Sequence, residues 1–451
     1  MILPRSRRKN EAMKILKFGG TSVGSPQRMK AVAQLITDGE RKIVVLSAMS
    51  GTTNALVEIA DYIHKNNVEA ANNIINKLRN KYLQHVAELY AQEENIKKTR
   101  ELLLHIFMHL HHLSSQDYSP TLEKEILAQG EIMSTNMMTN YLREQGVNVM
   151  LVPALDYMRT DSKGEPDMPY IKEHLSGILE RNAHYDLYVT QGFICRNSDN
   201  EVDNLQRGGS DYTACLIGAA ICAEEIQIWT DIDGMHNNDP RFVESTAPVR
   251  QLNFEEAAEL AYFGAKILHP TCIQPARYAG VPVKLLNTMD PTAPGTVIND
   301  QMQTGTIKAV AAKDNITAVK IVSSRMLLAT GFLRMVFEIF EQNQTPIDMV
   351  TTSEVGITLT VDNNAHLANI VDELKKYGKV DIDENMCIIC VVGDLQWGNV
   401  GFETLVTEAL SHIPVRMISY GGSNHNISFL VRETDKKAAL CALSDKLFNH
   451  K

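Results

Sequence analysis

Residues 13–50 read MKILKFGGTSVGSPQRMKAVAQLITDGERKIVVLSAMS and decide the fold of the N-terminal part of the chain. The apolar runs KILKFGG at 14–20 and KIVVLSAMSG at 42–51 are typical of strands, and residues 27–38 have the pattern of a helix. Strand, helix and strand in this order form a βαβ unit, which predicts a parallel sheet. The preceding residues 1–12 are basic but lack the apolar segment of a secretory signal, so we expect a flexible extension.

The same alternation of strand-like and helical patterns continues to about residue 300. Strand-like apolar runs recur at 147–153, 186–193, 225–232 and 281–287, with helical patterns between most of them. Residues 54–116 form a long helical excursion that could cover a site. We therefore predict a doubly wound α/β sheet, with ligands at the carboxyl ends of its strands.

Beyond residue 300 the chain contains an internal repeat. PIDMVT at 346–351 aligns with PVRMIS at 414–419, and ITLTV at 357–361 aligns with ISFLV at 427–431. An amphipathic helix starts near a glycine before each first strand, and helices at 365–377 and 435–448 follow each second strand. This repeat predicts two ferredoxin-like modules, which more often bind a small regulator than perform chemistry.

Composition limits the class of protein. The chain has 451 residues, 44% of them apolar, and 44 Lys and Arg against 54 Asp and Glu give a net charge of −10. This length predicts roughly three domains. The acidic balance argues against nucleic acid or an anionic membrane as the main partner, and no apolar stretch is long enough to span a bilayer. Seven scattered cysteines, an odd number, are typical of a reducing cytoplasm.

Three glycine-containing turns, at 17–22, 207–211 and 230–234, each lie next to a charged residue and follow a strand or open a helix. Glycines allow backbone N–H groups to approach phosphate oxygens, and a helix N-terminus adds positive potential. Each turn alone is better explained as a simple tight turn, but together the three favour nucleotide binding. None matches the common P-loop or dinucleotide-binding patterns.

The motifs KFGGTSVG (17–24), QGEIMS (129–134), TQGFI (190–194), QRGGSDYTA (206–214), WTDIDG (229–234), DPR (239–241) and FGAKILHP (263–270) resemble, in this order, those of aspartate kinases. The resemblance covers nearly the whole chain from Met13. MVTTSEV (349–355) and SYGGSNHNISFLV (419–431) look most like the lysine-sensitive monofunctional type. It implies an amino-acid kinase αβα sandwich at 13–299, followed by two βαββαβ ACT domains at 300–386 and 387–451.

The resemblance also implies the chemistry. An aspartate kinase transfers the γ-phosphoryl group of MgATP to the side-chain carboxylate of L-aspartate, the first step towards lysine, threonine and methionine, under feedback control by an amino acid, here L-lysine. A carboxylate is already ionised at neutral pH, so no general base is required. Catalysis then depends on alignment and on neutralising the transferring phosphoryl group. A homodimer or larger assembly through the ACT domains is also implied.

Site residues follow from the same resemblance. The catalytic pair is Lys17 and Asp211. The implied substrate contacts are Thr53, Glu131, Arg207, Gly208, Gly209 and Ser210. The implied ATP contacts are Lys17, Gly19, Gly20, Thr230, Asp231, His236, Arg241 and Lys266, where His236 replaces a tyrosine common in lysine-sensitive relatives. The implied effector contacts are Met326, Phe332, Leu333, Asp348, Ser353 and Glu354.

Ordinary structural roles remain open for several of these residues. Considered singly, Glu131 is compatible with a helix-surface carboxylate, Thr53 with a helix N-cap and Lys266 with a helix-end cation. Met326, Phe332 and Leu333 are compatible with a plain hydrophobic core. At the level of function, a related kinase of another carboxylate and a non-catalytic amino-acid sensor are the alternatives. Retention of Lys17 and Asp211 argues against the sensor.

Overall fold

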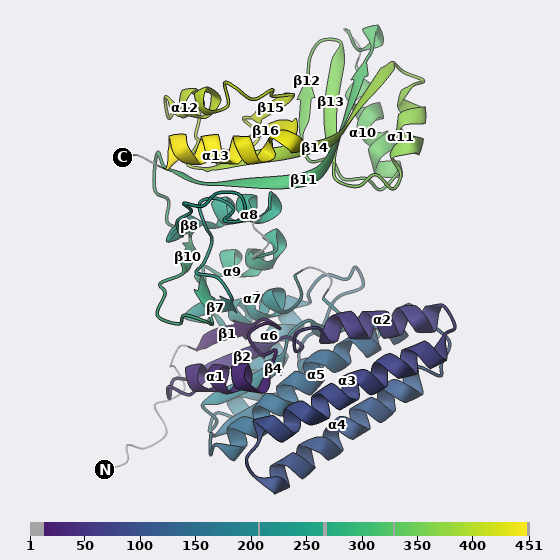
Figure 1. Ribbon diagram of the computed structural model, residues 1–451, viewed down its shortest axis with the longest axis vertical. Helices are drawn as coiled ribbons and strands as arrows, with labels where there is room; N and C mark the ends of the chain where they lie inside the picture. Colours follow the sequence, from purple (N-terminus) through teal and green to yellow (C-terminus); the bar gives the residue numbers. More distant parts are fainter. Residues whose placement is uncertain (1–12, 206–207, 265–267, 328–329, 449–451) are drawn as a thin grey trace. The chain divides into compact units, whose positions relative to one another are not determined.

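The computed structural model describes residues 13–205, 208–264, 268–327 and 330–448. The described residues form two compact units, one from 13–235 and 268–300, the other from 236–264 and 301–448 (Figure 1). The second unit therefore includes a stretch that the chain inserts between two parts of the first. Each unit has its own sheet and core.

The sheet of the first unit confirms the predicted mainly parallel arrangement. Its strands lie in the order β3-β4-β2-β1-β7-β9-β10, parallel except for β10. Their bounds are β1 Lys14–Phe18, β2 Lys42–Leu46, β3 Val149–Val152, β4 Leu187–Gln191, β7 Glu225–Thr230, β9 Val283–Asn287 and β10 Thr296–Asn299, and a hairpin of β5 (Ile194–Arg196) and β6 (Val202–Asn204) lies beside it.

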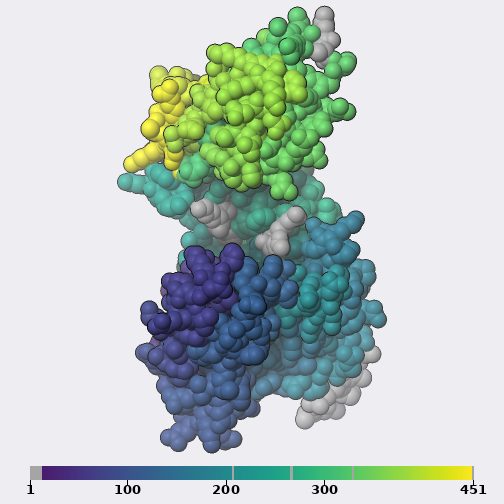
Figure 2. Space-filling view, turned by 90° about the vertical axis from the view of Figure 1, so that its right-hand side faces the viewer, coloured from purple at the N-terminus to yellow at the C-terminus, as the bar shows by residue number. Residues whose placement is uncertain are grey.

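Helices cover both faces of this sheet. One face carries α1 (Pro26–Ile36), α2 (Thr52–His64), α3 (Val68–Leu89), α4 (Glu93–Leu113) and α5 (Pro120–Glu144), whose apolar sides share one core with β1 and β2. The other carries α6 (Met168–Arg181), α7 (Gly209–Ile221) and α9 (Gln274–Tyr278). Figure 2 shows α2 to α4, purple to blue, as one continuous part of the first unit's surface. No described helix is long and apolar enough to cross a bilayer.

The second unit contains an antiparallel sheet in the order β12-β13-β11-β14-β16-β15. The strands are β11 Ile307–Val322, β12 Val350–Thr352, β13 Gly356–Val361, β14 Lys379–Gly393, β15 Met417–Tyr420 and β16 Asn426–Arg432. On one face, α10 (Phe332–Gln342) and α11 (Leu367–Leu374) cover one half, and α12 (Phe402–Ala409) and α13 (Lys436–Leu447) cover the other. The short β8 (Gln251–Asn253) and α8 (Phe254–Tyr262) also belong to this unit.

The two ferredoxin-like modules share their central strands. β11 and β14 are 16 and 15 residues long and run antiparallel through both modules. The first half of β11 pairs with the second half of β14 beside β16, whereas its second half lies between β13 and the first half of β14. The predicted boundary between residues 386 and 387 falls within β14, and the predicted domain ranges remain a proposal.

Candidate active site

The candidate site lies where the parallel strands of the first unit end. Phe18 of β1 is in register with Leu46 of β2 and with Trp229 of β7, so these three strands finish at the same level. The residues that follow them, beginning with Gly19, Ser47 and Thr230, therefore gather at one edge of the sheet. Two of the three glycine turns, those after β1 and β7, therefore lie at the carboxyl ends of neighbouring strands.

Lys17 and Asp211 form the central ion pair of this edge. Lys17 Nζ lies 2.7 Å from Asp211 Oδ1, and the two side chains are 12% and 16% exposed. A Cβ atom on Gly19 would lie 3.5 Å from the same ammonium, so Gly19 lies directly beside the Lys17 side chain. A largely buried but accessible cation is suited to phosphoryl oxygens.

Gly208 and Gly209 determine how the chain enters α7. Gly208 is the N-cap, and both glycines have positive φ, 66° and 50°. Asp211 consequently lies in the first turn of α7, where the helix dipole favours negative charge. Gly208 is also crowded, because a Cβ atom there would lie 1.8 Å from Cys272 Sγ, whereas the nearest atom to a Cβ on Gly209 would be Phe193 Cδ2 at 3.6 Å.

We expect Gly208→Ala to lose about 2–4 kcal/mol of unfolding free energy and most of the turnover, because the left-handed backbone and the overlap with Cys272 act together. Gly209 also has a positive φ, but a Cβ atom there would make only an ordinary van der Waals contact. Gly209→Ala should therefore lose only about 1–2 kcal/mol of unfolding free energy. Chemical denaturation and initial rates would measure both effects. Adding Cys272→Ala to Gly208→Ala should recover part of the loss, and no recovery would contradict the packing explanation.

Glu131 lies on α5 and is buried, with 4% of the residue exposed, so the alternative of a helix-surface carboxylate is wrong. Gly130 allows this placement, since a Cβ there would lie 2.8 Å from the Ala48 side chain. The Ala48 N–H donates to Glu131 Oε1 at 3.1 Å. Burial raises the pKa of Glu131 to about 7, against the opposing effects of the Ala48 N–H and the Lys17 ammonium. Such a carboxylate is suited to receive a substrate ammonium.

A chain of serines joins the β2 end to α5 and α7, and the sequence analysis missed it. Ser47 donates from Oγ to Ser210 Oγ at 2.9 Å, and Ser134 donates to the Ser47 carbonyl at 2.8 Å. The Ser210 side chain can occupy this position only because residue 192 is glycine: a Cβ atom on Gly192 would lie 2.3 Å from it. Ser47 directly follows a buried strand, as Gly19 does. Its position after an apolar run was the feature of the sequence that could have indicated a place at the site.

The remaining predicted residues of the first unit have more exposed positions. Thr53 is exposed on the first turn of α2, whose N-cap is Gly51, so the N-cap alternative is wrong. Thr230 accepts from the Ile232 N–H and donates to Asp231, which is itself exposed. Gly20 has no room for a side chain, because a Cβ would lie 2.8 Å from the Ala48 carbonyl oxygen. Arg207 and Lys266 lie outside the described residues.

Two predicted ATP contacts belong to the second unit. His236 Nδ1 is hydrogen-bonded to Thr246 Oγ1 at 2.9 Å. The exposed Arg241 forms a two-pronged pair with Asp239, with Nη2 at 2.6 Å from Oδ2 and Nε at 3.0 Å from Oδ1. Their part in nucleotide binding therefore stays a prediction.

A hollow in the second unit brings together most of the predicted effector residues. It has a volume of about 360 Å³ and is lined by Met326, Leu327, Gly331, Phe332, Leu333, Ser353 and Glu354. The core alternative is wrong for Leu333, which is 42% exposed, whereas Phe332 belongs to the core and also lines the hollow. Asp348 is not among the lining residues.

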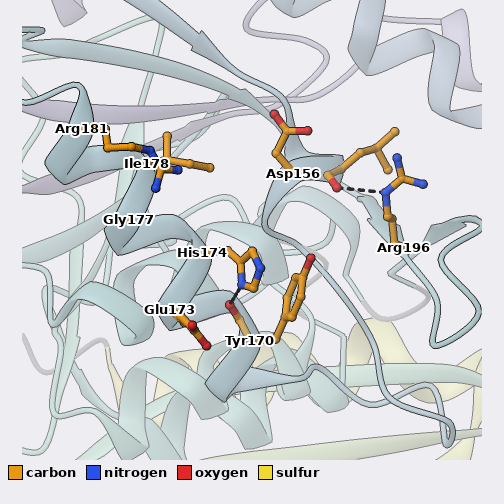
Figure 3. A pocket seen from close by; sticks show the side chains of 9 residues that line it. Asp156, Tyr170, Glu173, His174, Gly177, Ile178, Arg181 and Arg196 are labelled. Carbon is orange, nitrogen blue, oxygen red and sulfur yellow. Dashed lines mark hydrogen bonds between the residues drawn. The ribbon is translucent and has the colours of Figure 1, made fainter.

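A second hollow, in the first unit, contains none of the predicted site residues. It has a volume of about 550 Å³ and is lined by Leu155, Asp156, Tyr170, Glu173, His174, Gly177, Ile178, Arg181 and Arg196. Figure 3 shows that Arg196 points at the Leu155 carbonyl and that His174 is bonded to the Tyr170 carbonyl of its own helix. Volume alone therefore does not identify the candidate site.

Comparison with known proteins shows the family of the chain. The amino acid kinase family matches residues 12–287, and an ACT domain matches residues 389–447. The chain is 32% identical over 447 residues to lysine-sensitive aspartokinase 3 of Escherichia coli, covering 96% of this chain and 99% of that protein. It is 35% identical over 468 residues to the chloroplastic aspartokinase 3 of Arabidopsis thaliana, covering 96% and 81%.

Solved structures are similar over the whole chain. E. coli aspartokinase III in complex with aspartate and ADP (R-state) is 32% identical, with a TM-score of 0.82. The same enzyme in complex with lysine and aspartate (T-state) is 33% identical, with a TM-score of 0.80. Both comparisons cover 97% of this chain and 100% of the solved chain.

Proposed function

The chain belongs to the aspartokinase family and is an ATP-dependent kinase of the aspartate carboxyl group, and from this premise we propose how its residues act. It transfers the γ-phosphoryl group of MgATP to the side-chain carboxylate of L-aspartate, giving 4-phospho-L-aspartate. This is the first step towards lysine, threonine and methionine. The observation that carries the residue assignment is the buried Lys17–Asp211 pair at the carboxyl ends of the parallel strands.

The described residues supply charge and alignment. Lys17 neutralises the transferring phosphoryl group, and Gly19 and Gly20 donate backbone N–H groups to the phosphate oxygens. Glu131 holds the substrate ammonium. Thr53 and Ser210 contact the substrate beside it, with Arg207 on a substrate carboxylate. The acceptor oxygen is already anionic, so none of these groups has to remove a proton.

Mg²⁺ fits this set of residues as the metal of MgATP. The cation is commonly bound through one or two carboxylates together with substrate phosphates. Asp211 provides a carboxylate at the N-terminus of α7, and the described residues contain no cluster of three or more potential ligands that would form a closed protein site. We propose that Asp211 is the carboxylate that would hold the Mg²⁺ of MgATP. When bound, this ion would neutralise phosphate charge.

Regulation by L-lysine is supported by the hollow at Met326, Phe332, Leu333, Ser353 and Glu354. A carboxylate and a hydroxyl beside apolar side chains are suited to an amino acid with a long aliphatic chain. An effector that binds the inactive arrangement more tightly shifts the population towards it. We also propose a cytoplasmic homodimer or larger assembly through the ACT modules; all seven cysteines are free thiols.

Trapping of the acyl phosphate by hydroxylamine tests this function. With MgATP we expect hydroxamate from L-aspartate, none from L-glutamate, and suppression by L-lysine. Suppression by L-threonine alone would keep the enzyme and overturn the effector. Product from another carboxylate and not from aspartate would overturn the substrate, and ATP binding without any product would favour an amino-acid sensor.

A further inference from the structure

The second hollow of the first unit contains charged side chains that the proposed phosphoryl transfer does not use. It lies between the 3₁₀ turn η2 (Ala154–Asp156), the helix α6 and the strand β5 (Figure 3). All of its lining residues belong to this one unit, and none of them is implied in binding aspartate or ATP. Its volume of about 550 Å³ is within the range of small-molecule sites, so the lining groups determine which ligand it fits.

Arg196 presents a fixed guanidinium to this hollow. Its backbone N–H donates to the Met158 carbonyl at 2.9 Å, and its own carbonyl accepts from the Thr160 N–H at 2.9 Å. The guanidinium donates from Nε to the Leu155 carbonyl at 3.1 Å and from Nη1 to the Asn200 carbonyl at 2.7 Å. Within the described part of the chain Nη2 has no acceptor. This nitrogen is therefore available to an anionic group of a ligand, in a side chain that is already held in place.

Three further charged side chains line the hollow, namely Asp156, Glu173 and Arg181. All three are exposed, and none forms an ion pair or a side-chain hydrogen bond with another of the described residues. A Cβ atom on Gly177 would lie 3.3 Å from Arg181 Nη1, so the Arg181 guanidinium lies back over the preceding turn of α6. Together with Arg196, the hollow thus has two cations and two carboxylates with no ion pair among them.

This balance of charge selects a class of ligand. A nucleotide or another polyanion is repelled by both carboxylates, and a polyamine is repelled by both guanidinium groups. A zwitterion offers a partner to each sign of charge. Figure 3 shows Asp156 and Arg196 on the same side of the hollow, with Arg181 on the other. Asp156 and Arg196 are therefore placed to receive the ammonium and the carboxylate that an α-amino acid carries on one carbon.

The space between these two sides has an aromatic and apolar wall. The rings of Tyr170 and His174 are stacked with their centroids 3.7 Å apart, and Arg159 Cζ lies 4.6 Å from the Tyr170 centroid. His174 Nδ1 is also hydrogen-bonded to the Tyr170 carbonyl at 2.9 Å, which fixes the ring pair. The partly buried Leu155 and Ile178 complete the wall. Such a wall is suited to an aliphatic side chain.

We propose that this hollow is a separate amino-acid site, which binds a free α-amino acid with an aliphatic side chain. Arg196 receives the carboxylate, Asp156 receives the ammonium, and Tyr170 and Ile178 contact the side chain. The site does not rest on the proposed phosphoryl transfer, because no residue of that reaction lines the hollow. It is also distinct from the effector hollow, which belongs to the second unit.

The test titrates L-leucine and L-methionine into the full-length protein by calorimetry. At least one of them should bind with a Kd of about 1 mM or tighter, and weaker binding of both would leave an ordinary solvated surface and overturn the proposal. The analogues 4-methylpentanoate and 3-methylbutylamine lack the ammonium and the carboxylate of leucine, and each should bind at least about tenfold more weakly than L-leucine. An analogue that binds as tightly as leucine would overturn the recognition of a zwitterion.

Hydrogen exchange locates the bound amino acid. It should slow exchange at 154–160, 170–181 and 194–197. Protection confined to 331–333 and 353–356 would place the amino acid in the effector hollow, and protection confined to 208–214 would place it in the candidate active site. Either result would overturn the proposal, whatever the outcome of the kinase assay.

Asp156→Asn is the deciding variant, because this exposed side chain has no partner in the described structure whose loss would affect folding. It should raise the Kd at least about tenfold, as should Arg196→Gln. Arg196→Gln also loses the bonds to two backbone carbonyls, so Asp156→Asn decides if that variant is unstable. Glu180→Gln is the matched control: Glu180 is exposed on α6 and does not line the hollow, so its Kd should stay within about twofold. A wild-type Kd in Asp156→Asn would overturn the proposal.

Discussion

Lys17→Met should lower kcat by about 10³–10⁴-fold, the largest effect expected in this protein. The substitution keeps the length and the apolar stem of the side chain but removes the ammonium from the carboxyl end of β1. The transferring phosphoryl group then loses a protein cation, in a site where the Lys17 side chain is 12% exposed and water screens little. ATP-dependent hydroxamate formation measures the loss.

The control for Lys17 is available on the same strand. Lys14→Met removes a cation that pairs with the exposed Glu40 at 2.8 Å, so its kcat should stay within about twofold of wild type. Lys17→Met also leaves Asp211 without its partner, so circular dichroism and nucleotide binding should be checked before kcat is interpreted. A folded Lys17→Met enzyme that turns over within about tenfold of wild type would remove Lys17 from the catalytic role.

Glu131→Gln should raise the KM for aspartate by about 10²-fold, because a buried carboxylate facing an ammonium is replaced by a neutral amide of the same shape. The wild type should also show a pH dependence that the variant lacks. Burial raises the pKa of Glu131 to about 7, so below that pH the free enzyme is protonated and must lose the proton to bind the ammonium. The wild-type KM should therefore rise about tenfold per pH unit below 7.

Stability gives an independent measure of the same group. The pKa of Glu131 is higher in the folded than in the unfolded protein, so folding favours its protonated form. Its contribution to stability is intact below about pH 4.5 and is lost as the pH rises through about 7. The wild type should accordingly lose up to about 3 kcal/mol of unfolding free energy, relative to Glu131→Gln, between pH 4.5 and pH 8.

Glu125→Gln on the same helix is the matched control for Glu131. Its carboxylate is partly exposed and pairs with His109 at 2.9 Å, so neither the KM for aspartate nor its pH dependence should change beyond about twofold. A wild-type KM that is flat between pH 6 and 8, or a Gln variant with the wild-type profile, would show that Glu131 does not receive the substrate ammonium.

Local patterns in the sequence were sufficient for the first elements of the parallel sheet, whereas the candidate site residues came from the resemblance. The apolar runs predicted at 14–20 and 42–51 contain β1 and β2, and Gly19 directly follows β1. These signals depend on neighbouring residues only, because alternation and turn formation are short-range properties. The effector contacts followed from the resemblance. All of them except Asp348 line one hollow, namely Met326, Phe332, Leu333, Ser353 and Glu354.

Long-range packing decided what the sequence alone left open. Glu131 has the pattern of a helix-surface carboxylate, and only the approach of α5 to Ala48, permitted by Gly130, buries it and shifts its pKa. The sharing of β11 and β14 by both modules could not be read from two repeats, because each repeat contains only part of its own sheet. Residues 236–264 belong to the second unit, although the chain passes through them between two parts of the first. Asp348 pairs with Tyr262 and Lys313, which lie 86 and 35 positions away in the sequence. Pairings over such distances depend on how complete surfaces fit together, and only the tertiary structure contains that information.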